Sequence, residues 1–284
     1  MPALNPNSPS EIAALLSGLG LTLKKRWGQN FLVNQGARER LVSLLQPGSG
    51  EMVWEIGAGL GSMTGILLPK VERLVAFEVD WGLCRYLEER FRSEPRLTLV
   101  CGDFLETWGN TLRDQGRPSK ILGNLPYSSA SLMVAQILES GIRPERLLVT
   151  VQRELADRMA SPPSTKSYSA FSVLCQACCE VAVRGELNPG SFYPPPNVVS
   201  AIVELRPREG APVGVVLSLL TRLTRAFFAS RRKTVRNNIG RTGLDAEQVL
   251  GAMDTLGLDP AARAEELSPG DFVRLAERLA ERLA

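Results

Sequence analysis

Histidine is absent from this sequence of 284 residues. Its absence excludes Ser-His-Asp and Cys-His catalysis, a histidine general base, and zinc or iron sites that use histidine ligands. Any reaction that the protein catalyses must therefore use other groups, and we expect no bound metal.

Cysteine is scarce and odd in number, because the chain has only Cys84, Cys101, Cys175, Cys178 and Cys179. An odd count in a chain of this length does not indicate a disulfide framework, and it favours a reducing compartment. The spacing of the last three suggests a metal site, but a closed zinc site needs four ligands and no second cysteine pair is present. Because these three lie in an apolar run over residues 171–183, we expect them to be core residues.

The sequence also lacks an apolar run long enough to cross a membrane. The apolar segment Ile12–Leu23 is far shorter than the roughly 20 residues that a spanning helix needs. The first ten residues contain no cationic stretch of the kind that begins a secretory signal. The sequence therefore predicts a cytoplasmic protein without membrane contact.

Strand-like and helix-like segments alternate through the first two-thirds of the chain. With 44% hydrophobic and 22% charged residues, the composition is that of a globular protein with a substantial core. Short apolar runs predict buried strands at Met52–Ile56, Leu74–Glu78, Leu97–Val100, Lys120–Leu122 and Leu147–Val151. Helical patterns lie between them, for example at Ser62–Leu68, Trp81–Arg92 and Ser129–Glu139. This alternation predicts an α/β fold with a parallel sheet covered by helices on both faces.

The pattern changes after Tyr168. Two long β-like runs, Phe171–Glu186 and Val198–Arg206, predict a hairpin at the edge of the sheet. From about Ala211 onward the apolar residues follow a helical period, in the segments Val213–Ser230, Gln248–Leu256 and Pro269–Leu283. Residues 206–212, which contain two prolines and a glycine, are the natural linker. We therefore predict an α/β domain over residues 1–207 and a small helical domain over residues 208–284.

The net charge of +3 conceals an uneven distribution. Residues 1–205 carry 20 basic and 20 acidic residues, residues 206–241 carry nine basic and one acidic, and residues 242–284 carry four basic and nine acidic. A solvated helix face can produce a short basic run. A basic stretch that covers a whole predicted helix and its flanks is typical of a surface that contacts a phosphate backbone. The charge therefore indicates a nucleic-acid partner without identifying a sequence.

A glycine-rich loop follows the first predicted strand of the sheet. The sequence Glu55-Ile-Gly57-Ala-Gly59-Leu-Gly61 lies between this strand and a predicted helix. Glycines there allow a tight turn and let a ligand lie against bare backbone. The G-x-G-x-G spacing differs from the G-x-G-x-x-G of dinucleotide-binding folds. By itself, the loop indicates a nucleotide-like ligand and no particular one.

Two acidic residues end the next two predicted strands. Glu78, 21 residues after Gly57, can accept hydrogen bonds from both hydroxyls of a ribose. Asp103 can reach an adenine amine. Each acid could instead be a helix N-cap or a solvated loop charge. Because the two acids and the glycine loop fall on one edge of the predicted sheet, we favour a cofactor, and S-adenosylmethionine fits best.

The sequence Asn124-Leu125-Pro126-Tyr127 directly follows the fourth predicted strand. It is of the Asn/Asp-Pro-Pro-Tyr/Phe type used by enzymes that methylate exocyclic amines of bases, whose nitrogen lone pair is delocalised into the ring. The Asn124 amide oxygen and the Leu125 carbonyl oxygen can accept the two amine N–H groups and localise that lone pair. Pro126 fixes the backbone so that the acceptors converge, and Tyr127 offers a face for an extruded base. An isolated motif of this kind can also be a simple turn.

Taken together, these motifs resemble those of the ribosomal RNA adenine N6,N6-dimethyltransferase family, and most of all its small-subunit branch. The resemblance runs from about Lys24 to Gly240. Besides the motifs above, it rests on the segments Lys25–Leu32, Val151–Met159, Ser191–Ser200 and Ala226–Asn238. It implies a Rossmann-like S-adenosylmethionine-dependent methyltransferase sheet followed by a small C-terminal helical domain that binds RNA.

The resemblance also implies roles for single residues. The cofactor-binding residues would be Asn30, Leu32, Gly57, Glu78, Asp103 and Asn124. The catalytic residues would be Asn124, Leu125, Pro126 and Tyr127, with Phe192 packing on the target adenine opposite Tyr127. The RNA-binding residues would be Arg231, Arg232, Lys233 and Arg236. The implied activity is dimethylation of two adjacent adenines near the 3′ end of small-subunit ribosomal RNA, with a role in assembly of the 30S subunit.

One segment departs from the family pattern, and three other functions stay open. Where the family commonly has Gly-Ser-Lys-x-Tyr-Gly-Arg, this chain has Ser164-Thr-Lys166-Ser-Tyr168-Ser-Ala170, so local RNA contacts or loop geometry can differ. The alternatives are methylation of large-subunit RNA, methylation of DNA adenine, and an RNA-binding assembly factor whose catalysis is dispensable. An intact Asn124 motif argues against a pure binder, and the segment after the linker is short for a DNA-recognition region. No heptad repeat demands a dimer, so we expect a monomer.

Overall fold

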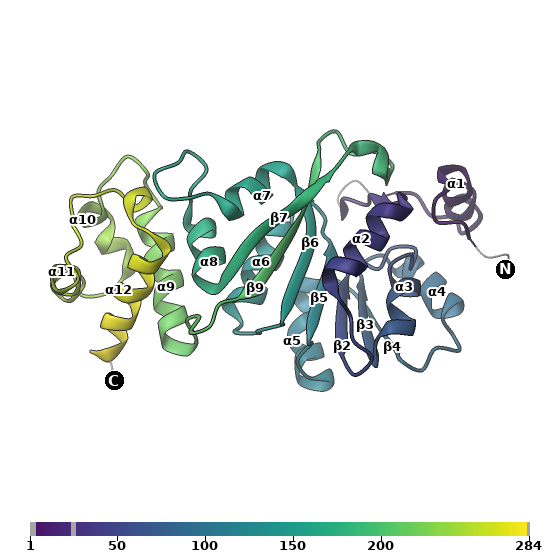
Figure 1. The fold of residues 1–284 in the computed structure, drawn as a ribbon, viewed down its shortest axis with the longest axis horizontal. Coiled ribbons are helices and arrows are strands. Elements are labelled where there is room, and N and C mark those ends of the chain that lie inside the picture. Colours follow the sequence, from purple (N-terminus) through teal and green to yellow (C-terminus); the bar gives the residue numbers. More distant parts are fainter. Residues whose placement is uncertain (1–3, 24–26, 283–284) are drawn as a thin grey trace. The chain divides into compact units, whose positions relative to one another are not determined.

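The computed structural model describes residues 4–23 and 27–282 (Figure 1). Its strands are β1 (Phe31–Leu32), β2 (Met52–Ile56), β3 (Arg73–Glu78), β4 (Leu97–Cys101), β5 (Lys120–Asn124), β6 (Arg146–Gln152), β7 (Cys179–Leu187), β8 (Phe192–Tyr193) and β9 (Ser200–Pro207). Its α-helices are α1 (Pro9–Gly18), α2 (Gln35–Leu45), α3 (Thr64–Leu67), α4 (Trp81–Arg90), α5 (Phe104–Gln115), α6 (Ala130–Glu139), α7 (Arg153–Ala160), α8 (Ala170–Cys178), α9 (Gly214–Phe227), α10 (Val235–Asn238), α11 (Ala246–Thr255) and α12 (Pro269–Glu281).

The main sheet has seven strands in the order β4-β3-β2-β5-β6-β9-β7. The first five of these pair in parallel, and β9 and β7 are neighbours at one edge, so the predicted fold class is confirmed. β5 is longer than predicted and ends at Asn124. The chain moves outward from β2 through β3 to β4 in one direction, and from β5 to β6 in the other. Between β2 and β5 the connections therefore diverge, which leaves a crevice at the carboxyl ends of these strands.

Helices cover both faces of the parallel strands. Successive side chains of a strand point to opposite faces, so Val53 and Trp54 of β2 belong to different layers. Val53 lies in a core cluster with Leu45 of α2. Trp54 packs edge-to-face against Phe77, which packs edge-to-face against Phe104 at the start of α5. Burial on both faces explains why these strands read as nearly continuous apolar runs.

The predicted β-like run over residues 171–186 is wrong in its first half. Residues Ala170–Cys178 form helix α8, and strand β7 begins at Cys179. The helix has a capping box in which the Ser169 hydroxyl accepts the Ser172 N–H and the Ser172 hydroxyl accepts the Ser169 N–H. A continuous apolar run does not distinguish a buried helix from a buried strand. The two capping serines were the local signal that could have corrected the interpretation.

The three clustered cysteines are free and buried, so the prediction that they belong to the core is confirmed. Burial raises the pKa of all three thiols, to about 11 for Cys178 and about 12 for Cys179. These thiols therefore stay protonated near neutral pH, and a protonated thiol is a poor metal ligand. Within the described ranges, no group of three or more side chains could hold a metal ion.

By internal packing the chain forms two compact units. The first comprises the chain up to Met133 together with Pro144–Arg153 and Val183–Glu204, and the second comprises Val134–Arg143, Glu154–Ala182 and the chain from Leu205 onward. The predicted domain boundary at residue 207 stays a prediction, because the compact units draw on interleaved segments rather than on two halves.

The second unit is helical in its C-terminal part, as predicted. Along α12, Phe272, Leu275, Ala276 and Leu279 are buried and recur at the spacing of one helix face. Phe272 meets Phe227 of α9 with 6.0 Å between the ring centroids. The periodic apolar residues of this segment therefore form the core between α9 and α12.

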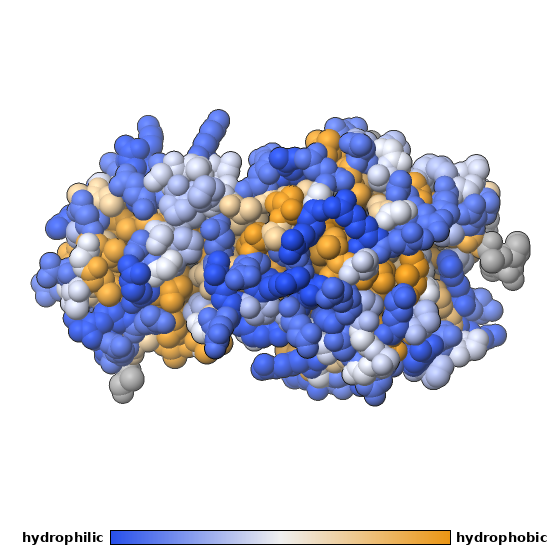
Figure 2. Space-filling model, in the orientation of Figure 1, coloured by the Kyte–Doolittle hydropathy of each residue, from blue (hydrophilic) through white to orange (hydrophobic). Residues whose placement is uncertain are grey.

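The face of the molecule in Figure 2 is mostly hydrophilic, with smaller apolar areas among the charged side chains. Among the described residues, the large apolar side chains that are exposed are Trp81, Leu132, Val183, Val198, Val213 and Val215. They come from several separate elements, and single exposed apolar residues are ordinary on protein surfaces. The predicted monomeric state stays a prediction.

Ser164, in the segment that departs from the family pattern, has a left-handed backbone. Its φ is +64°, a conformation that costs an ordinary L-residue about 1–2 kcal/mol and glycine almost nothing. Its N–H donates to the carbonyl oxygen of Glu265 at 2.7 Å, which holds the turn in place. The loop thus keeps the backbone shape that a glycine would adopt, although the glycine itself is missing.

Replacing Ser164 with glycine is expected to raise the free energy of unfolding by about 0.5–1 kcal/mol, because the relief of backbone strain exceeds the added entropy of the unfolded chain. Urea denaturation would measure the change. Ser167 is a matched control, since it is an exposed serine of the same loop and its φ is not positive. Ser167→Gly should lower stability, and a loss of stability in Ser164→Gly would contradict the strain argument.

Candidate active site

A cavity of about 220 Å³ lies at the carboxyl ends of β2, β3, β4 and β5, within the first unit. Most of the predicted cofactor and catalytic residues line it: Asn30, Gly57, Glu78, Asp103, Asn124, Leu125, Pro126 and Tyr127. This is the edge of the sheet where the strand connections diverge, and open α/β sheets bind their ligands there. Folding therefore brings together segments that are far apart in the sequence.

Two of the predicted residues do not line the cavity. Leu32 and Phe192 pair with each other between β1 and β8, and both side chains are buried in the core cluster, with Phe192 only 3% exposed. Pairing of β1 with β8 holds the preceding residue Asn30 on the cavity wall. In this structure the side chains of Leu32 and Phe192 pack in the core and do not face the cavity. Sequence could not show this, because the partner strand lies 160 residues further along the chain.

The glycine loop leaves room against bare backbone. Gly57 and Gly59 have φ values of +82° and +57°, which favour glycine. A Cβ atom at Gly57 would lie 3.2 Å from the Asn124 carbonyl oxygen, and one at Gly59 would lie 3.1 Å from the Phe31 ring. Side chains at these two positions would therefore crowd the walls of the cavity.

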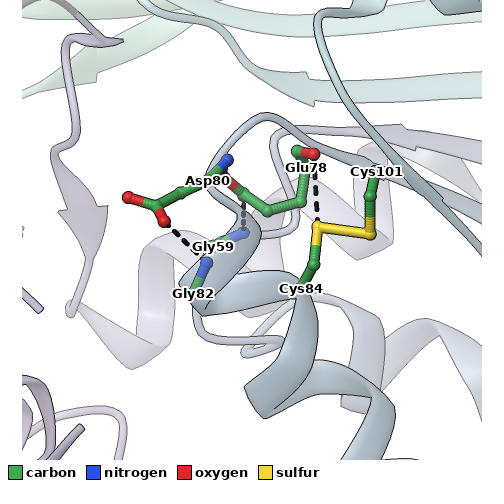
Figure 3. Close-up of a disulfide and its surroundings, with 6 residues drawn as sticks. All are labelled: Gly59, Glu78, Asp80, Gly82, Cys84 and Cys101. Carbon is green, nitrogen blue, oxygen red and sulfur yellow. Dashed lines mark hydrogen bonds between the residues drawn. A yellow bond between two sulfur atoms is a disulfide. The ribbon is translucent and has the colours of Figure 1, made fainter. Parts of the chain in front are cut away.

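Glu78 joins the glycine loop to the start of α4 (Figure 3). One carboxylate oxygen accepts the Gly59 N–H at 2.7 Å, and the other accepts the Asp80 N–H at 2.9 Å. Burial raises the pKa of the Glu78 carboxyl, and these two hydrogen bonds oppose the shift. The backbone thus holds the carboxylate in one orientation at the cavity, where two ribose hydroxyls can approach its remaining lone pairs.

Asp103 has both of the roles that the sequence left open. It is the N-cap of α5, where one carboxylate oxygen accepts the Leu105 N–H at 2.9 Å. It also lines the cavity, and among the described residues its second oxygen has no hydrogen-bond partner. An amine of a bound ligand can therefore donate to that second oxygen.

Asn124 is oriented by a contact that sequence reasoning missed. Its amide nitrogen donates to the backbone carbonyl oxygen of Asn30 at 2.9 Å. This fixes the amide plane and leaves the side-chain oxygen as the acceptor at the cavity. The Leu125 N–H donates to the Thr150 carbonyl oxygen at 3.2 Å, whereas the Leu125 carbonyl oxygen accepts no hydrogen bond from any described residue. Both residues line the cavity, and each has an acceptor oxygen without a donor among the described residues.

Tyr127, which follows these residues in the sequence, also lines the cavity. Its phenolic oxygen lies 2.5 Å from the hydroxyl oxygen of Ser200, the first residue of β9. Burial raises the pKa of the Tyr127 phenol, so the group stays neutral near neutral pH. The aromatic ring is therefore held by a specific partner.

Glu55, the first residue of the glycine-loop motif, is buried like Glu78. Its side chain is only 3% exposed and accepts the Thr64 hydroxyl at 2.7 Å. Burial raises the pKa of Glu55 to about 8, the Thr64 hydrogen bond opposes this shift, and the nearby charge of Glu78 adds to it. No local motif marks Glu55 as a carboxyl group that is protonated at neutral pH.

A disulfide lies beside the same acids. Cys84 of α4 and Cys101 of β4 are joined, with 6.1 Å between their Cα atoms, and the Cys84 sulfur lies 3.4 Å from the carbonyl oxygen of Glu78 (Figure 3). The odd cysteine count predicted no disulfide framework, and for this pair the prediction is wrong. Parallel pairing sets Cys101 opposite Glu78, and the following helix brings Cys84 back over the same strand ends.

Comparison with known families agrees with this geometry. Residues 20–281 match the family described as "Ribosomal RNA adenine dimethylase". The chain belongs to this family. The resemblance that the sequence motifs indicated is therefore confirmed, and the protein is an enzyme of the ribosomal RNA adenine dimethyltransferase class.

Similar members of the rRNA adenine dimethylase family are known from several bacteria. A protein of Treponema pallidum (strain Nichols) named "Ribosomal RNA small subunit methyltransferase A" is 40% identical over 283 residues, which cover 97% of each chain. A protein of the same name from Acinetobacter baylyi is 35% identical over 261 residues, with 92% of this chain and 93% of the relative covered.

Two solved structures share the fold of this rRNA adenine dimethylase. A dimethyladenosine transferase from Plasmodium falciparum superposes with a TM-score of 0.73 at 22% identity, covering 85% of this chain and 94% of that one. The 23S rRNA methyltransferase ErmE superposes with a TM-score of 0.62 at 25% identity, covering 88% of this chain and 100% of that one. The methyltransferase sheet predicted from the sequence is thus confirmed.

The basic segment of this rRNA adenine dimethylase lies in the second unit and divides into two kinds of residue. Arg231 donates to a carboxylate oxygen of Glu265 at 2.7 Å and to the carbonyl oxygen of Lys166 at 2.7 Å. Arg232, Lys233 and Arg236 are exposed and have no ion-pair partner among the described residues. Arg231 therefore anchors the loop around Lys166, while its three neighbours are available to a ligand.

In the ranges 4–23 and 27–282, no helix is both long enough and apolar enough to cross a bilayer. Of the entry motif predicted at Lys25–Leu32, residues 25 and 26 lie outside the described residues. In the described part of that motif, residues 27–31 line the cavity and Leu32 lies in the core.

Proposed function

We propose that this protein transfers methyl groups from S-adenosylmethionine to the N6 amine of adenines in small-subunit ribosomal RNA. The single observation that carries the proposal is the pair of acceptors at Asn124 and Leu125. An exocyclic amine has two N–H donors, and these two oxygens stand at the cavity without donors of their own. Two relatives that are 40% and 35% identical to this chain carry the name of a small-subunit methyltransferase, which favours this RNA over the large-subunit alternative.

The cavity fits the proposed cofactor. Gly57 and Gly59 leave bare backbone at the floor, Glu78 offers carboxylate lone pairs to ribose hydroxyls, and Asp103 offers an oxygen to the adenine amine. Asn30 is held on the wall by its contact with Asn124. When bound, S-adenosylmethionine supplies a methyl group that is activated by the positive charge on its sulfur.

The chain itself contributes positioning rather than acid–base chemistry. The Asn124 side-chain oxygen and the Leu125 carbonyl oxygen would accept hydrogen bonds from the amine N–H groups, which turns the nitrogen lone pair toward the cofactor pocket. One amine proton would be released to solvent for each methyl group that the nitrogen gains. Pro126 fixes the backbone between the two functional groups, and the ring of Tyr127 stacks on the extruded base. Orienting two reactants in this way can supply much of the rate acceleration. No histidine is required, in agreement with the composition.

The expected product is dimethyladenosine at two adjacent adenines near the 3′ end of the RNA, formed on an assembling 30S subunit. Mass analysis of nucleosides from unmethylated small subunits, after incubation with the protein and labelled S-adenosylmethionine, tests this directly. Labelled dimethyladenosine in that RNA would support the proposal. Product in large-subunit RNA alone would show that large-subunit RNA, and not small-subunit RNA, is the substrate. Cofactor binding without any methylated RNA would overturn the proposed reaction.

The exposed residues Arg232, Lys233 and Arg236 are expected to contribute to RNA affinity, whereas Arg231 is expected to contribute to the free energy of unfolding. Arg232→Ala or Lys233→Ala should weaken binding and lower the slope of log affinity against log salt by about 0.9 per lost phosphate contact. Arg231→Ala should lower the free energy of unfolding by about 1–2 kcal/mol, since it removes charge-assisted hydrogen bonds to Glu265 and to the Lys166 loop.

Filter binding at several salt concentrations, with urea denaturation of the same variants, measures both effects. The RNA-binding role first assigned to Arg231 is tested by the same data. If Arg231→Ala changes the salt slope as much as Arg232→Ala and leaves stability unchanged, the division between the two kinds of residue is wrong.

A further inference from the structure

We propose that Ser200 is a positioning residue for methyl transfer, because its hydroxyl holds the phenol of Tyr127 and so fixes the ring face that meets the target base. The inference rests on the proposed function of the Asn124 cavity. It adds a residue that lies on another strand, at the end of the Ser191–Ser200 segment, to which the sequence motifs gave no role of its own.

The contact is short and shielded from water. The two hydroxyl oxygens are 2.5 Å apart, at the short end of the range for O–H···O hydrogen bonds. Ser200 is fully buried, so water cannot replace Tyr127 as its partner without a change in packing. Among the described residues, neither hydroxyl has another hydrogen-bond partner. The two groups therefore satisfy each other.

The position of Ser200 is set by the sheet and not by a flexible loop. It is the first residue of β9, which neighbours β6, and β6 in turn neighbours β5, the strand that ends at Asn124. The Arg153 N–H donates to the Val199 carbonyl oxygen at 3.0 Å, which fixes the start of β9 against the end of β6. The hydroxyl that holds Tyr127 is thus tied to the same rigid sheet that carries the two amine acceptors.

The orientation of this one ring matters because no second predicted aromatic faces it. Phe192, the other ring expected at the target base, is buried in the core behind the wall. Stacking depends on the plane of the ring, and a base that tilts moves its amine away from the acceptors at Asn124 and Leu125. A displacement of about 1 Å can cost two orders of magnitude in rate. A hydrogen bond at the far end of the phenol fixes the position of that end and so limits such displacement of the ring.

The hydrogen bond between Ser200 and Tyr127 could also have a purely structural role, in which each hydroxyl only satisfies the other. A double-mutant cycle distinguishes this role from positioning of the target base. The variants are Tyr127→Phe, Ser200→Ala and the double variant, assayed on unmethylated small subunits for kcat and KM. If the hydroxyl pair positions the base, each single change should lower kcat about tenfold, and the double change should lower it no further. Ser200→Thr retains a hydroxyl and should restore most of kcat.

Ser172 supplies a matched control. It is also fully buried, and its hydroxyl donates to the Arg158 carbonyl oxygen at 2.5 Å, but it lies in α8 of the second unit. Ser172→Ala should lose a similar amount of stability and keep the wild-type kcat. Wild-type kcat in Ser200→Ala, or losses that multiply in the double variant, would overturn the inference while leaving the proposed function intact. Failure of the wild-type protein to form dimethyladenosine would instead overturn the proposed function.

Discussion

Replacement of Asn124 by alanine is expected to reduce methyl transfer to RNA by at least about 10²–10³-fold, the loss typical of removing one preorganised hydrogen-bonding group from an active site. The substitution removes the side-chain acceptor for the amine and frees the Asn30 carbonyl from its donor. The amine then keeps only the Leu125 carbonyl as an acceptor, so its lone pair is no longer fixed toward the cofactor pocket. Single-turnover rates with saturating cofactor and RNA measure the loss.

The test needs a control for folding and one for orientation. Asn110→Ala makes the same chemical change at an exposed position on α5 and should leave the rate unchanged. Asn124→Asp keeps acceptor oxygens but cannot donate to the Asn30 carbonyl, so its rate should lie between those of the wild type and Asn124→Ala. An Asn124→Ala enzyme that methylates RNA at the wild-type rate would contradict the acceptor mechanism. Equilibrium binding of S-adenosylmethionine by each variant shows whether the loss lies in chemistry or in cofactor binding.

The largest expected effect on stability comes from Glu55. Burial raises the pKa of its carboxyl from 4.5 to about 8. A carboxyl group with a raised pKa binds its proton more tightly in the folded state, so folding is favoured at low pH and this contribution is lost as pH rises. The loss begins near the ordinary pKa of glutamate and is complete above about pH 8. Integrated over this range, it amounts to on the order of 5 kcal/mol.

Glu55→Gln should remove this dependence. The amide oxygen of glutamine can still accept the Thr64 hydroxyl, and the side chain has no charge to bury. Urea denaturation at pH 5, 7 and 9 should show the variant gaining stability over the wild type as pH rises. Glu88→Gln removes an exposed carboxylate from α4 and serves as the control. A constant difference between Glu55→Gln and the wild type at all three pH values would show that Glu55 ionises normally.

Local sequence was a good guide to the strands and to the residues at their ends. The five parallel strands are short apolar runs bounded by polar residues, and burial on both faces makes that pattern hard to mistake. In parallel strands, all carboxyl ends meet at one edge. Gly57, Glu78, Asp103 and Asn124 each lie at the end of a strand or within two residues after it, so their convergence on one cavity follows from the topology.

Interpretation failed where two local structures bury the same residues. The run from Phe171 to Glu186 is apolar whether it forms a helix or a strand, and only the cap at Ser169 marks the start of α8. The role of Phe192 at the target base stays a prediction, and in this structure its ring lies in the core, because β8 pairs with β1. In both places packing against distant elements decided the outcome.

The sequence by itself determined the α/β class, the place of the cofactor pocket and the amine-binding motif, because each depends on periodicity or on residues that are neighbours along the chain. Only the tertiary structure decided how these groups are oriented. Asn124 is fixed by Asn30, Tyr127 by Ser200, and Arg231 is drawn to Glu265. The pKa of Glu55 likewise reflects the burial of its carboxyl. Such contacts join side chains across dozens of residues, and their geometry exists only once the sheet and the helices have packed.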